Sequence, residues 1–238
     1  MKDKRAVILC GGKGTRLMPY TVALPKPLMP IGDYPIIEVI VRQLKEYGYK
    51  KITLAVNHQA DIFKAFFGDG KKWGIEIDYV LEKKPLGTMG ALGLIDDLSE
   101  NFLVMNGDVL TDMNFGEFYE SHQINKSIFS ISSFKRNHLV DFGVLEKSSE
   151  SYLTGFREKP EFNFEVSMGV YMVNKEAVKY IQKDSFFGFD SLMLKFIDNG
   201  DKVKLIEHEG FWLDIGRPDD YIMATEVFNK NKHKFINE

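Results

Sequence analysis

The chain has 238 residues and a net charge of -3, from 31 basic and 34 acidic side chains. This near balance excludes a general affinity for nucleic acid or anionic membranes, and no apolar run approaches the roughly twenty residues of a membrane span. The single cysteine, Cys10, excludes an internal disulfide and is typical of a reducing compartment, so we expect a cytoplasmic protein.

The first half of the sequence alternates between strand-like and helix-like segments. Apolar runs of strand length occur at 6–10, 52–56, 75–81 and 102–105, and apolar residues recur at helical spacing over 36–47, 62–67 and 89–95. Such alternation predicts an α/β fold with a Rossmann-like, mostly parallel sheet flanked by helices. Ligands bind beyond the carboxyl ends of such strands, so the segments that follow them are the first candidates for a site.

The second half of the sequence has a different pattern of predicted elements. After a helix expected at 115–122, short strands are expected at 128–134, 143–146, 152–157 and 166–173, which predicts a smaller antiparallel or mixed section. Helices are expected to return at 175–181, 190–198 and 218–229. Because no repeat or linker interrupts the sequence, we predict a single domain over 1–238, with halves near 1–125 and 126–238.

The segment after the first strand has the composition of a cradle for a polyanion. It reads Cys10-Gly11-Gly12-Lys13-Gly14-Thr15-Arg16, and its glycines leave backbone N–H groups open to phosphate oxygens. Arg16 and Lys26, the latter in Pro25-Lys26-Pro27, add positive charge. Two familiar phosphate motifs are excluded, because Gly14 is not followed by Lys-Ser/Thr and a third dinucleotide glycine would fall at Leu17.

Two acids follow apolar strands next to glycines. Asp108 comes after 102–105 through Asn106-Gly107, and Asp214 lies in Trp212-Leu213-Asp214-Ile215-Gly216. Magnesium binds a few hard oxygens together with waters and substrate phosphates, so two carboxylates are enough for a site that forms around a nucleotide. From the sequence alone, a helix cap or a turn explains each aspartate equally well.

The compound pattern G-G-x-G-T-R-L with P-K-P downstream resembles the signature of the sugar-1-phosphate nucleotidyltransferases, and the resemblance covers nearly the whole chain. It implies transfer of a nucleoside monophosphate from a nucleoside triphosphate to a sugar 1-phosphate, with the first half of the chain binding nucleotide and the second half binding sugar. It implies Mg²⁺ on Asp108 and Asp214, and catalytic roles for Arg16, Lys26 and Asp108. The nucleotide contacts that it implies are Cys10, Gly11, Gly12, Gly14, Thr15, Arg16, Lys26, Glu82, Pro85, Gly87 and Thr88.

The resemblance also implies a sugar-phosphate site. In Glu158-Lys159-Pro160 it places Lys159 on the phosphate and Glu158 on sugar hydroxyls, and it places Gly143, Gly169 and Asn106 in the sugar pocket. From the residues alone, an exposed turn at 157–160 and a bulge or tight packing point at each glycine are alternatives.

The segment 81–91 resembles the base-recognition loop of the family. Glu82, when ionised, only accepts hydrogen bonds, and guanine presents two adjacent donors, whereas uracil, thymine and cytosine place an acceptor beside a donor. Mispaired buried polar groups cost on the order of 1 to 3 kcal/mol, which favours GTP. The run also looks most like guanylyltransferases for mannose, heptose or glucosamine 1-phosphate, with Met89 as a departure. Alternatives are an exposed strand-end role for Glu82 and a uridylyl-, thymidylyl- or cytidylyltransferase.

Two rival functions remain. A glycosyltransferase typically carries D-x-D, which Asp108-Val109-Leu110 does not supply, although Asp112 is near. A non-catalytic relative that binds nucleotide sugars would be expected to lose a charged site residue, and all five (Arg16, Lys26, Asp108, Lys159 and Asp214) are present. The sugar stays open, and so does the oligomeric state, with a homo-oligomer as one alternative.

Overall fold

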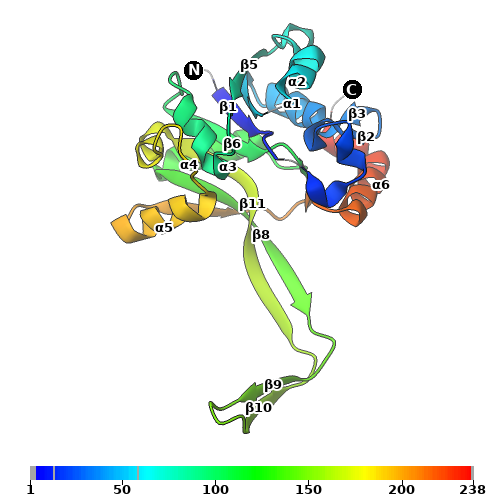
Figure 1. The fold of residues 1–238 in the computed structure, drawn as a ribbon, viewed down its shortest axis with the longest axis vertical. Helices are drawn as coiled ribbons and strands as arrows, with labels where there is room; N and C mark the ends of the chain where they lie inside the picture. The colour runs from blue at the N-terminus through cyan, green and yellow to red at the C-terminus, as the bar shows by residue number, and fades with distance from the viewer. Residues whose placement is uncertain (1–3, 13, 58, 237–238) are drawn as a thin grey trace.

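A computed structural model describes residues 4–12, 14–57 and 59–236, so Lys13 of the glycine segment lies outside the described residues. Its centre is a seven-stranded sheet in the order β12-β8-β11-β6-β1-β4-β5, drawn in Figure 1. Pairing is parallel for β1 with β4 and β6, for β4 with β5 and for β12 with β8, while β11 runs antiparallel to β6 and β8. The strands are β1 Lys4–Leu9, β4 Tyr49–Val56, β5 Glu76–Leu81, β6 Asn101–Asn106, β8 Phe129–Leu139, β11 Glu161–Asn174 and β12 Val203–Glu207.

Helices cover both faces of this sheet because its central strands are apolar on both sides. Along β1, Ala6 and Ile8 belong to one buried cluster, and Val7 to a second. The first cluster includes residues of α1 Ile36–Glu46, α2 Ala60–Phe67 and α4 Phe115–Asn125, and the second includes residues of α3 Gly87–Gly90 and α5 Phe189–Asn199. The predicted fold class, a mixed and mostly parallel sheet flanked by helices, is confirmed.

A third apolar cluster packs beside the sheet. It joins the segment Leu17–Ile31 to the small antiparallel pair β7 Val109–Thr111 and β13 Trp212–Asp214, and to the final helix α6 Pro218–Phe235. The bonded pair β2 Pro30–Ile31 and β3 Tyr34–Pro35 leads into α1. This cluster holds the chain around Arg16, Lys26 and Asp214 against the end of the sheet.

Strands β8 and β11 are longer than the sequence predicts and leave the body of the protein together. Figure 1 shows them as a two-stranded ribbon, ending in the hairpin of β9 Val144–Lys147 and β10 Leu153–Arg157. We call residues 134–166 the arm. The expected strands 128–134 and 166–173 are therefore too short, because each continues as paired backbone from the sheet into the arm.

Other boundaries also differ from the predictions. The helices expected at 89–95 and 175–181 are the single turn α3 followed by the 3-10 turn Ala91–Leu94, and the 3-10 helix Lys175–Tyr180. Further 3-10 turns are Thr15–Leu17, Tyr20–Val22, Lys26–Leu28 and Lys71–Trp73. Strands β2, β3, β7 and β12 were not predicted. No helix among the described residues is long and apolar enough to cross a membrane.

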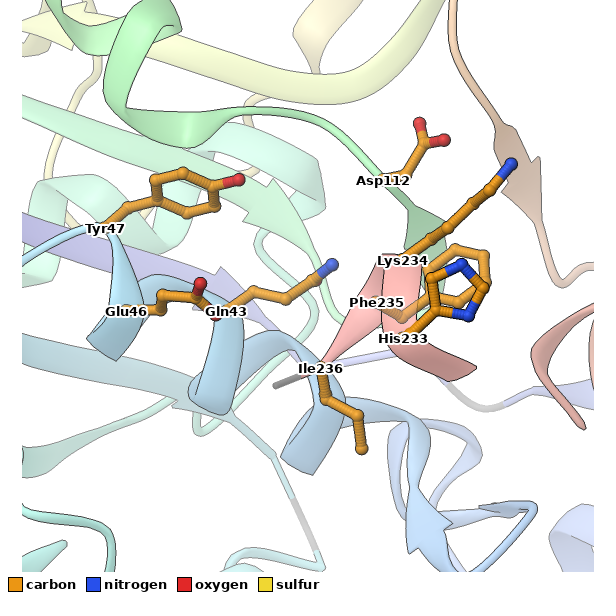
Figure 2. Close-up of a pocket in the computed structure, with 8 residues that line it drawn as sticks. All are labelled: Gln43, Glu46, Tyr47, Asp112, His233, Lys234, Phe235 and Ile236. Carbon is orange, nitrogen blue, oxygen red and sulfur yellow. The ribbon is translucent and has the colours of Figure 1, made fainter. Parts of the chain in front are cut away.

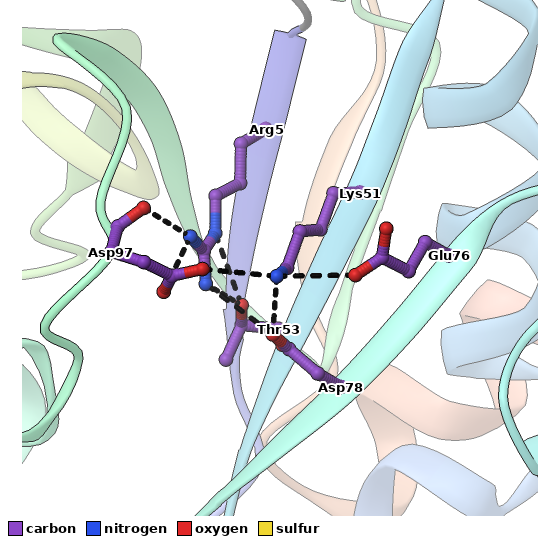
Figure 3. Close-up of polar contacts among 6 residues, drawn as sticks. All are labelled: Arg5, Lys51, Thr53, Glu76, Asp78 and Asp97. Carbon is purple, nitrogen blue, oxygen red and sulfur yellow. Dashed lines mark hydrogen bonds and ion pairs between the residues drawn. The ribbon is translucent and has the colours of Figure 1, made fainter.

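The amino ends of the parallel strands carry a network of charges, shown in Figure 3. The buried Arg5 guanidinium donates to Thr53 Oγ1 at 2.7 Å and pairs with Asp97 at 2.9 Å. Lys51 contacts Asp78, Asp97 and Glu76 at 2.9 to 3.1 Å. These ion pairs lie at the edge of the sheet opposite to the one that carries the predicted site.

Candidate active site

The register of the sheet brings four loops to one edge. Leu9 of β1 is level with Ala55 of β4 and Asn106 of β6, and Val56 of β4 is level with Leu81 of β5. All four strands run parallel, so the segments that begin at Cys10, Asn57, Glu82 and Gly107 leave the sheet at the same edge. The glycine segment, the base-recognition segment and Asp108 therefore lie together, as expected for ligand sites in such sheets.

The described glycines of the first loop differ in whether the surrounding residues leave room for a side chain. Gly14 has φ +61°, its carbonyl accepts a hydrogen bond from Thr21 Oγ1 at 2.8 Å, and a Cβ there would lie 2.9 Å from Thr21 Cγ2. A Cβ on Gly11 would lie 2.7 Å from Glu82 Oε1. Gly12 is exposed, and apart from Gly12 itself and its chain neighbours no described atom lies within 4 Å of the position of its Cβ. No described contact requires glycine at 12, so its exposed backbone is accessible to a ligand.

Four charged side chains lie together next to the strand pair β7 and β13. Lys26 is buried and its ammonium group pairs with Asp108 Oδ2. The Asp108 carbonyl accepts a hydrogen bond from Ile215 N at 3.1 Å, which keeps Asp214 beside it. A Cβ on Gly216 would lie 3.4 Å from Asp214 Oδ2 and 3.6 Å from the Arg16 guanidinium nitrogens. The predicted residues Arg16, Lys26, Asp108 and Asp214 thus form one cluster.

The electrostatics of this cluster suit a cation. Burial raises the pKa of Asp214, and the neighbouring charge of Asp108 raises it further, while Lys26 and Arg16 lower it. No described residue bonds to the buried Asp108 Oδ1. Two close carboxylates, one with an oxygen free of partners, fit a Mg²⁺ ion that takes its other ligands from water and phosphate. No larger group of metal-ligating side chains occurs in the described part of the chain.

Glu82 lies close to Gly11, at the start of the glycine loop. Its Oε2 accepts a hydrogen bond from Leu86 N at 3.3 Å, and partial burial raises its pKa. Burial raises the pKa of the Cys10 thiol, with added repulsion from Asp108 and then Glu82, so Cys10 is a neutral packing residue between the two acids. Glu82 and Asp108 therefore face one shared region around Cys10.

The rest of the base-recognition segment is fixed by contacts within the protein. Gly87 has φ +76°, and a Cβ there would lie 2.7 Å from the carbonyl of Phe187. Thr88 Oγ1 accepts a hydrogen bond from Phe189 N at 2.8 Å. Thr15 and Pro85 are exposed. The observed contacts of Gly87 and Thr88 thus dock the segment on residues 186–189 and leave Glu82 to face the site.

The five predicted sugar-phosphate residues divide into two groups. Gly169, with φ +73°, packs on Asn106, where a Cβ would lie 2.5 Å from Asn106 Nδ2, and both are at the edge of the sheet beside Asp108. Gly143 packs on Glu158, where a Cβ would lie 3.2 Å from Glu158 Oε2, and Lys159 follows with φ +41°. The second group lies on the arm, which extends away from the site in Figure 1. The structure does not bring Gly143, Glu158 and Lys159 to the charged cluster.

Sequence reasoning missed one residue of the site. Asn57 follows β4, and its amide donates to the carbonyl of Gly11, which fixes the start of the glycine loop. A polar residue directly after a buried strand at the same edge was the signal that could have identified it. His58, next in the chain, lies outside the described residues.

A separate pocket of about 160 Å³, shown in Figure 2, lies between the end of α1 and the end of α6. Its lining includes Gln43, Tyr47 and Asp112 with His233 and Lys234, and none of the predicted site residues. Gln43 already donates to the carbonyl of Thr111 at 2.8 Å. We therefore place the candidate active site at the charged edge and not in this pocket.

Comparisons with known proteins identify the relatives of this chain. Residues 5–231 match the Nucleotidyl transferase family. The chain is 32% identical over 234 residues to probable mannose-1-phosphate guanylyltransferase 1 of Oryza sativa subsp. japonica, covering 94% of this chain and 64% of that protein. It is 28% identical over 240 residues to UTP–glucose-1-phosphate uridylyltransferase of Synechocystis sp., covering 92% and 62%. The chain thus spans about 64% of the length of the first of these relatives.

Solved structures show the same fold. HddC from Yersinia pseudotuberculosis superimposes with a TM-score of 0.72 at 27% identity, over 94% of this chain and 99% of that one, and it has also been solved in complex with GMP-PN. A putative glucose-1-phosphate thymidylyltransferase from Bacillus anthracis, in complex with a sucrose, gives 0.77 at 23% identity, over 99% and 97%.

The fold and the site define an α/β protein whose sheet carries glycines, cations and two acids at the carboxyl edge of its parallel strands. The family model matches residues 5–231, which is most of the chain. The chain therefore belongs to the Nucleotidyl transferase family.

Proposed function

We propose that the protein transfers a nucleoside monophosphate, GMP from GTP, to a sugar 1-phosphate and releases pyrophosphate. The observation that carries the proposal is the cluster of Arg16, Lys26, Asp108 and Asp214 beside an open glycine loop. Two polyanionic reactants repel each other, and this edge supplies cations and backbone N–H groups to both. The alternative of a silent binding protein is disfavoured because every charged group that the reaction needs is present.

In this reaction a sugar-phosphate oxygen bonds to the α-phosphorus while the bond from that phosphorus to the β-phosphate oxygen breaks. The attacking oxygen is already an anion, so the protein needs no general base, and positioning with charge neutralisation supplies the catalysis. Arg16 and the glycine backbone would hold the β- and γ-phosphates, and Lys26 would steady the leaving pyrophosphate and the α-phosphate. Mg²⁺ held by Asp108 and Asp214 would neutralise charge on the α-phosphate.

The preference for GTP depends on Glu82. Its carboxylate only accepts hydrogen bonds, faces the start of the glycine loop, and is held by the backbone of Leu86. The guanylyltransferase named among the relatives and the GMP-PN complex of HddC support guanine, while the uridylyltransferase relative keeps UTP as the alternative.

The test is a matrix of GTP, UTP, CTP and dTTP against mannose, heptose, glucosamine and glucose 1-phosphates with Mg²⁺, scored for pyrophosphate. We expect GTP to exceed the other nucleotides at least about tenfold, and Glu82→Gln to lower GTP use about tenfold to a hundredfold. Glu226→Gln, an exposed change on α6, is the control. A preference for UTP or dTTP would overturn the base assignment, and no pyrophosphate from any pair would overturn the reaction.

A further inference from the structure

The arm lacks the support that a two-stranded ribbon needs. Beyond Ser133, which pairs with Glu207, β8 has no outer neighbour in the described part of the chain, and β11 pairs with β6 only from Val170 onward. From there to the pair Glu161–Leu139, the two strands bond only to each other. An isolated two-stranded hairpin is marginally stable in water, so a ribbon of this length needs another surface.

Aromatic side chains gather on one face of the arm. Pairing places Phe134, Val166, Phe164 and Phe162 on this face together with Arg136 and His138, and it places Lys135, Glu165, Asn163, Glu161 and Leu139 on the opposite face. We call the aromatic side the apolar face, although Arg136 lies on it with its guanidinium over the rings of Phe134 and Trp212. Phe164 is 53% exposed and Phe142, at the tip, is 77% exposed. Five more large apolar side chains of the arm are also exposed: Leu139, Leu145, Tyr152, Leu153 and Phe156.

The body carries a matching apolar surface beside the charged cluster. We call it the rim, and it comprises Met18, Tyr20, Val22 and Leu24 with Ile222 and Met223 of α6, all exposed. The rings of Tyr20 and Tyr221 lie 5.9 Å apart and join the loop to the helix. The rim begins two residues after Arg16 and ends two residues before Lys26, so whatever covers the rim also borders the site.

Three of the five predicted sugar-phosphate residues lie away from the charged cluster of their own chain. Glu158, Lys159 and Gly143 stand beyond the paired segment 161–167, which spans about 20 Å at the rise of a β-strand. The continuous pairing keeps this segment straight, and Figure 1 shows it directed away from the body. The arm needs a surface that covers its apolar face, and Glu158 and Lys159 need a nearby site. A second copy of the chain can supply both, because its rim can cover the apolar face and its charged cluster can receive Glu158 and Lys159.

We propose that two copies exchange arms about a two-fold axis, so that the apolar face of each arm lies on the partner's rim and delivers Glu158 and Lys159 to the partner's site. Such an exchange gives an isologous dimer at little energetic cost. The roles of Glu158 and Lys159 rest on the proposed function, whereas the dimer rests on the exposed surfaces alone.

The proposed dimer interface can be tested without an activity assay. Sedimentation velocity at micromolar concentrations should give a dimer for the wild type and for Asn163→Asp, and a monomer for Phe164→Asp and Tyr20→Asp. The two arm variants add the same charge at neighbouring positions on opposite faces of β11, and Tyr20→Asp probes the acceptor surface if an arm variant folds poorly. A monomeric wild type, or dimerisation that survives both Phe164→Asp and Tyr20→Asp, would overturn the exchange.

The shared site is tested by complementation. Lys159→Ala and Asp108→Asn, co-expressed with different tags and purified as a heterodimer, should regain about half of wild-type turnover, because one site then has an intact body and an intact arm. A heterodimer of wild type with the double variant should be nearly inactive. The reverse pattern would show that each arm serves its own body, and full turnover of homodimeric Lys159→Ala would refute its role. A wild-type dimer that releases no pyrophosphate would refute the proposed function but not the interface.

Discussion

At the scale of single residues, the charged cluster combines one exposed cation and one buried ion pair. Arg16 is exposed, in a short turn anchored by the buried Leu17, whereas Lys26 is buried against Asp108. The two cations therefore differ in what their removal costs. Loss of Arg16 takes charge from the phosphate-binding edge without emptying the core, and loss of Asp108 also leaves the Lys26 ammonium buried without its partner.

We expect Arg16→Ala to lower turnover at least about a hundredfold while the free energy of unfolding changes by less than about 0.5 kcal/mol. Arg16→Lys should retain part of the activity, because it keeps the charge but loses the planar fork. Asp108→Asn should lose comparable turnover and also some stability. Pyrophosphate release and urea unfolding measure both effects, with Lys230→Ala on the surface of α6 as the charge control. Near-normal turnover of Arg16→Ala would contradict its role.

His122 gives the protein a pH-dependent stability. It is buried on α4, its ring contacts Ser130 Oγ at 2.8 Å and Asn101 Oδ1 at 3.2 Å, and burial lowers its pKa to about 4. Between that value and the unfolded pKa of about 6.5, the unfolded chain binds a proton that the folded chain does not, so stability falls as the pH falls.

From pH 7.5 to pH 5 this one group should cost about 2 kcal/mol of unfolding free energy. Urea unfolding at the two pH values measures the loss, and His122→Gln, which cannot titrate, should remove most of it. An equal loss of stability in His122→Gln would assign the effect to other groups.

At the scale of elements, the sequence predicted the buried strands and the helices α1, α2, α4, α5 and α6, and failed where periodicity is weak. The stretch 89–95 contains Gly90 and Gly93, which favour short turns over a continuous helix. β12 reads Val-Lys-Leu-Ile-Glu, a half-exposed edge strand with little apolar signal. No element was predicted for residues 161–165, and nothing in the sequence says that β11 already begins there.

We expect two glycines at the carboxyl edge of the sheet to have different roles, one in stability and the other in binding. Gly169→Ala should lower the free energy of unfolding by at least about 1 to 2 kcal/mol, because position 169 has φ +73° and its Cβ would meet the Asn106 amide. Gly12→Ala should leave stability unchanged within about 0.5 kcal/mol, since its Cβ meets open space, but should raise the KM for the nucleoside triphosphate. Thermal unfolding and steady-state kinetics distinguish the two. An unchanged KM in Gly12→Ala would remove position 12 from the phosphate cradle.

At the scale of the whole molecule, the sequence predicted where the residues at the carboxyl edge lie, but it did not predict where the residues of the arm lie. The carboxyl-edge rule places Cys10, Glu82, Asn106 and Asp108 together, because it follows from the chain direction of parallel strands. The position of the arm depends on tertiary pairing and on what covers it, and neither is encoded in a local pattern. Glu158 and Lys159 could therefore be identified by resemblance but not placed.

The amino edge of the sheet contributes to stability and the carboxyl edge carries the candidate site. Substitutions at the amino edge should therefore change the free energy of unfolding and not turnover. Arg5 is buried and holds Thr53, Asp78 and Asp97, while the carboxyl edge carries the candidate site. Asp78 and Asp97 are partly exposed and also pair with Lys51, so removing Arg5 leaves chiefly the buried Thr53 hydroxyl without a partner. We expect this to cost about 1 to 3 kcal/mol.

We therefore expect Arg5→Met to lower the free energy of unfolding by about 1 to 3 kcal/mol and to leave turnover per folded molecule unchanged at 25 °C. Glu76→Gln, at the exposed end of the same network, should cost less than about 1 kcal/mol because solvent screens its pair with Lys51. Urea unfolding and pyrophosphate release on the same samples test both statements. If Arg5→Met lost turnover at unchanged stability, the amino edge would influence the chemistry, and the division of tasks between the two edges would be wrong.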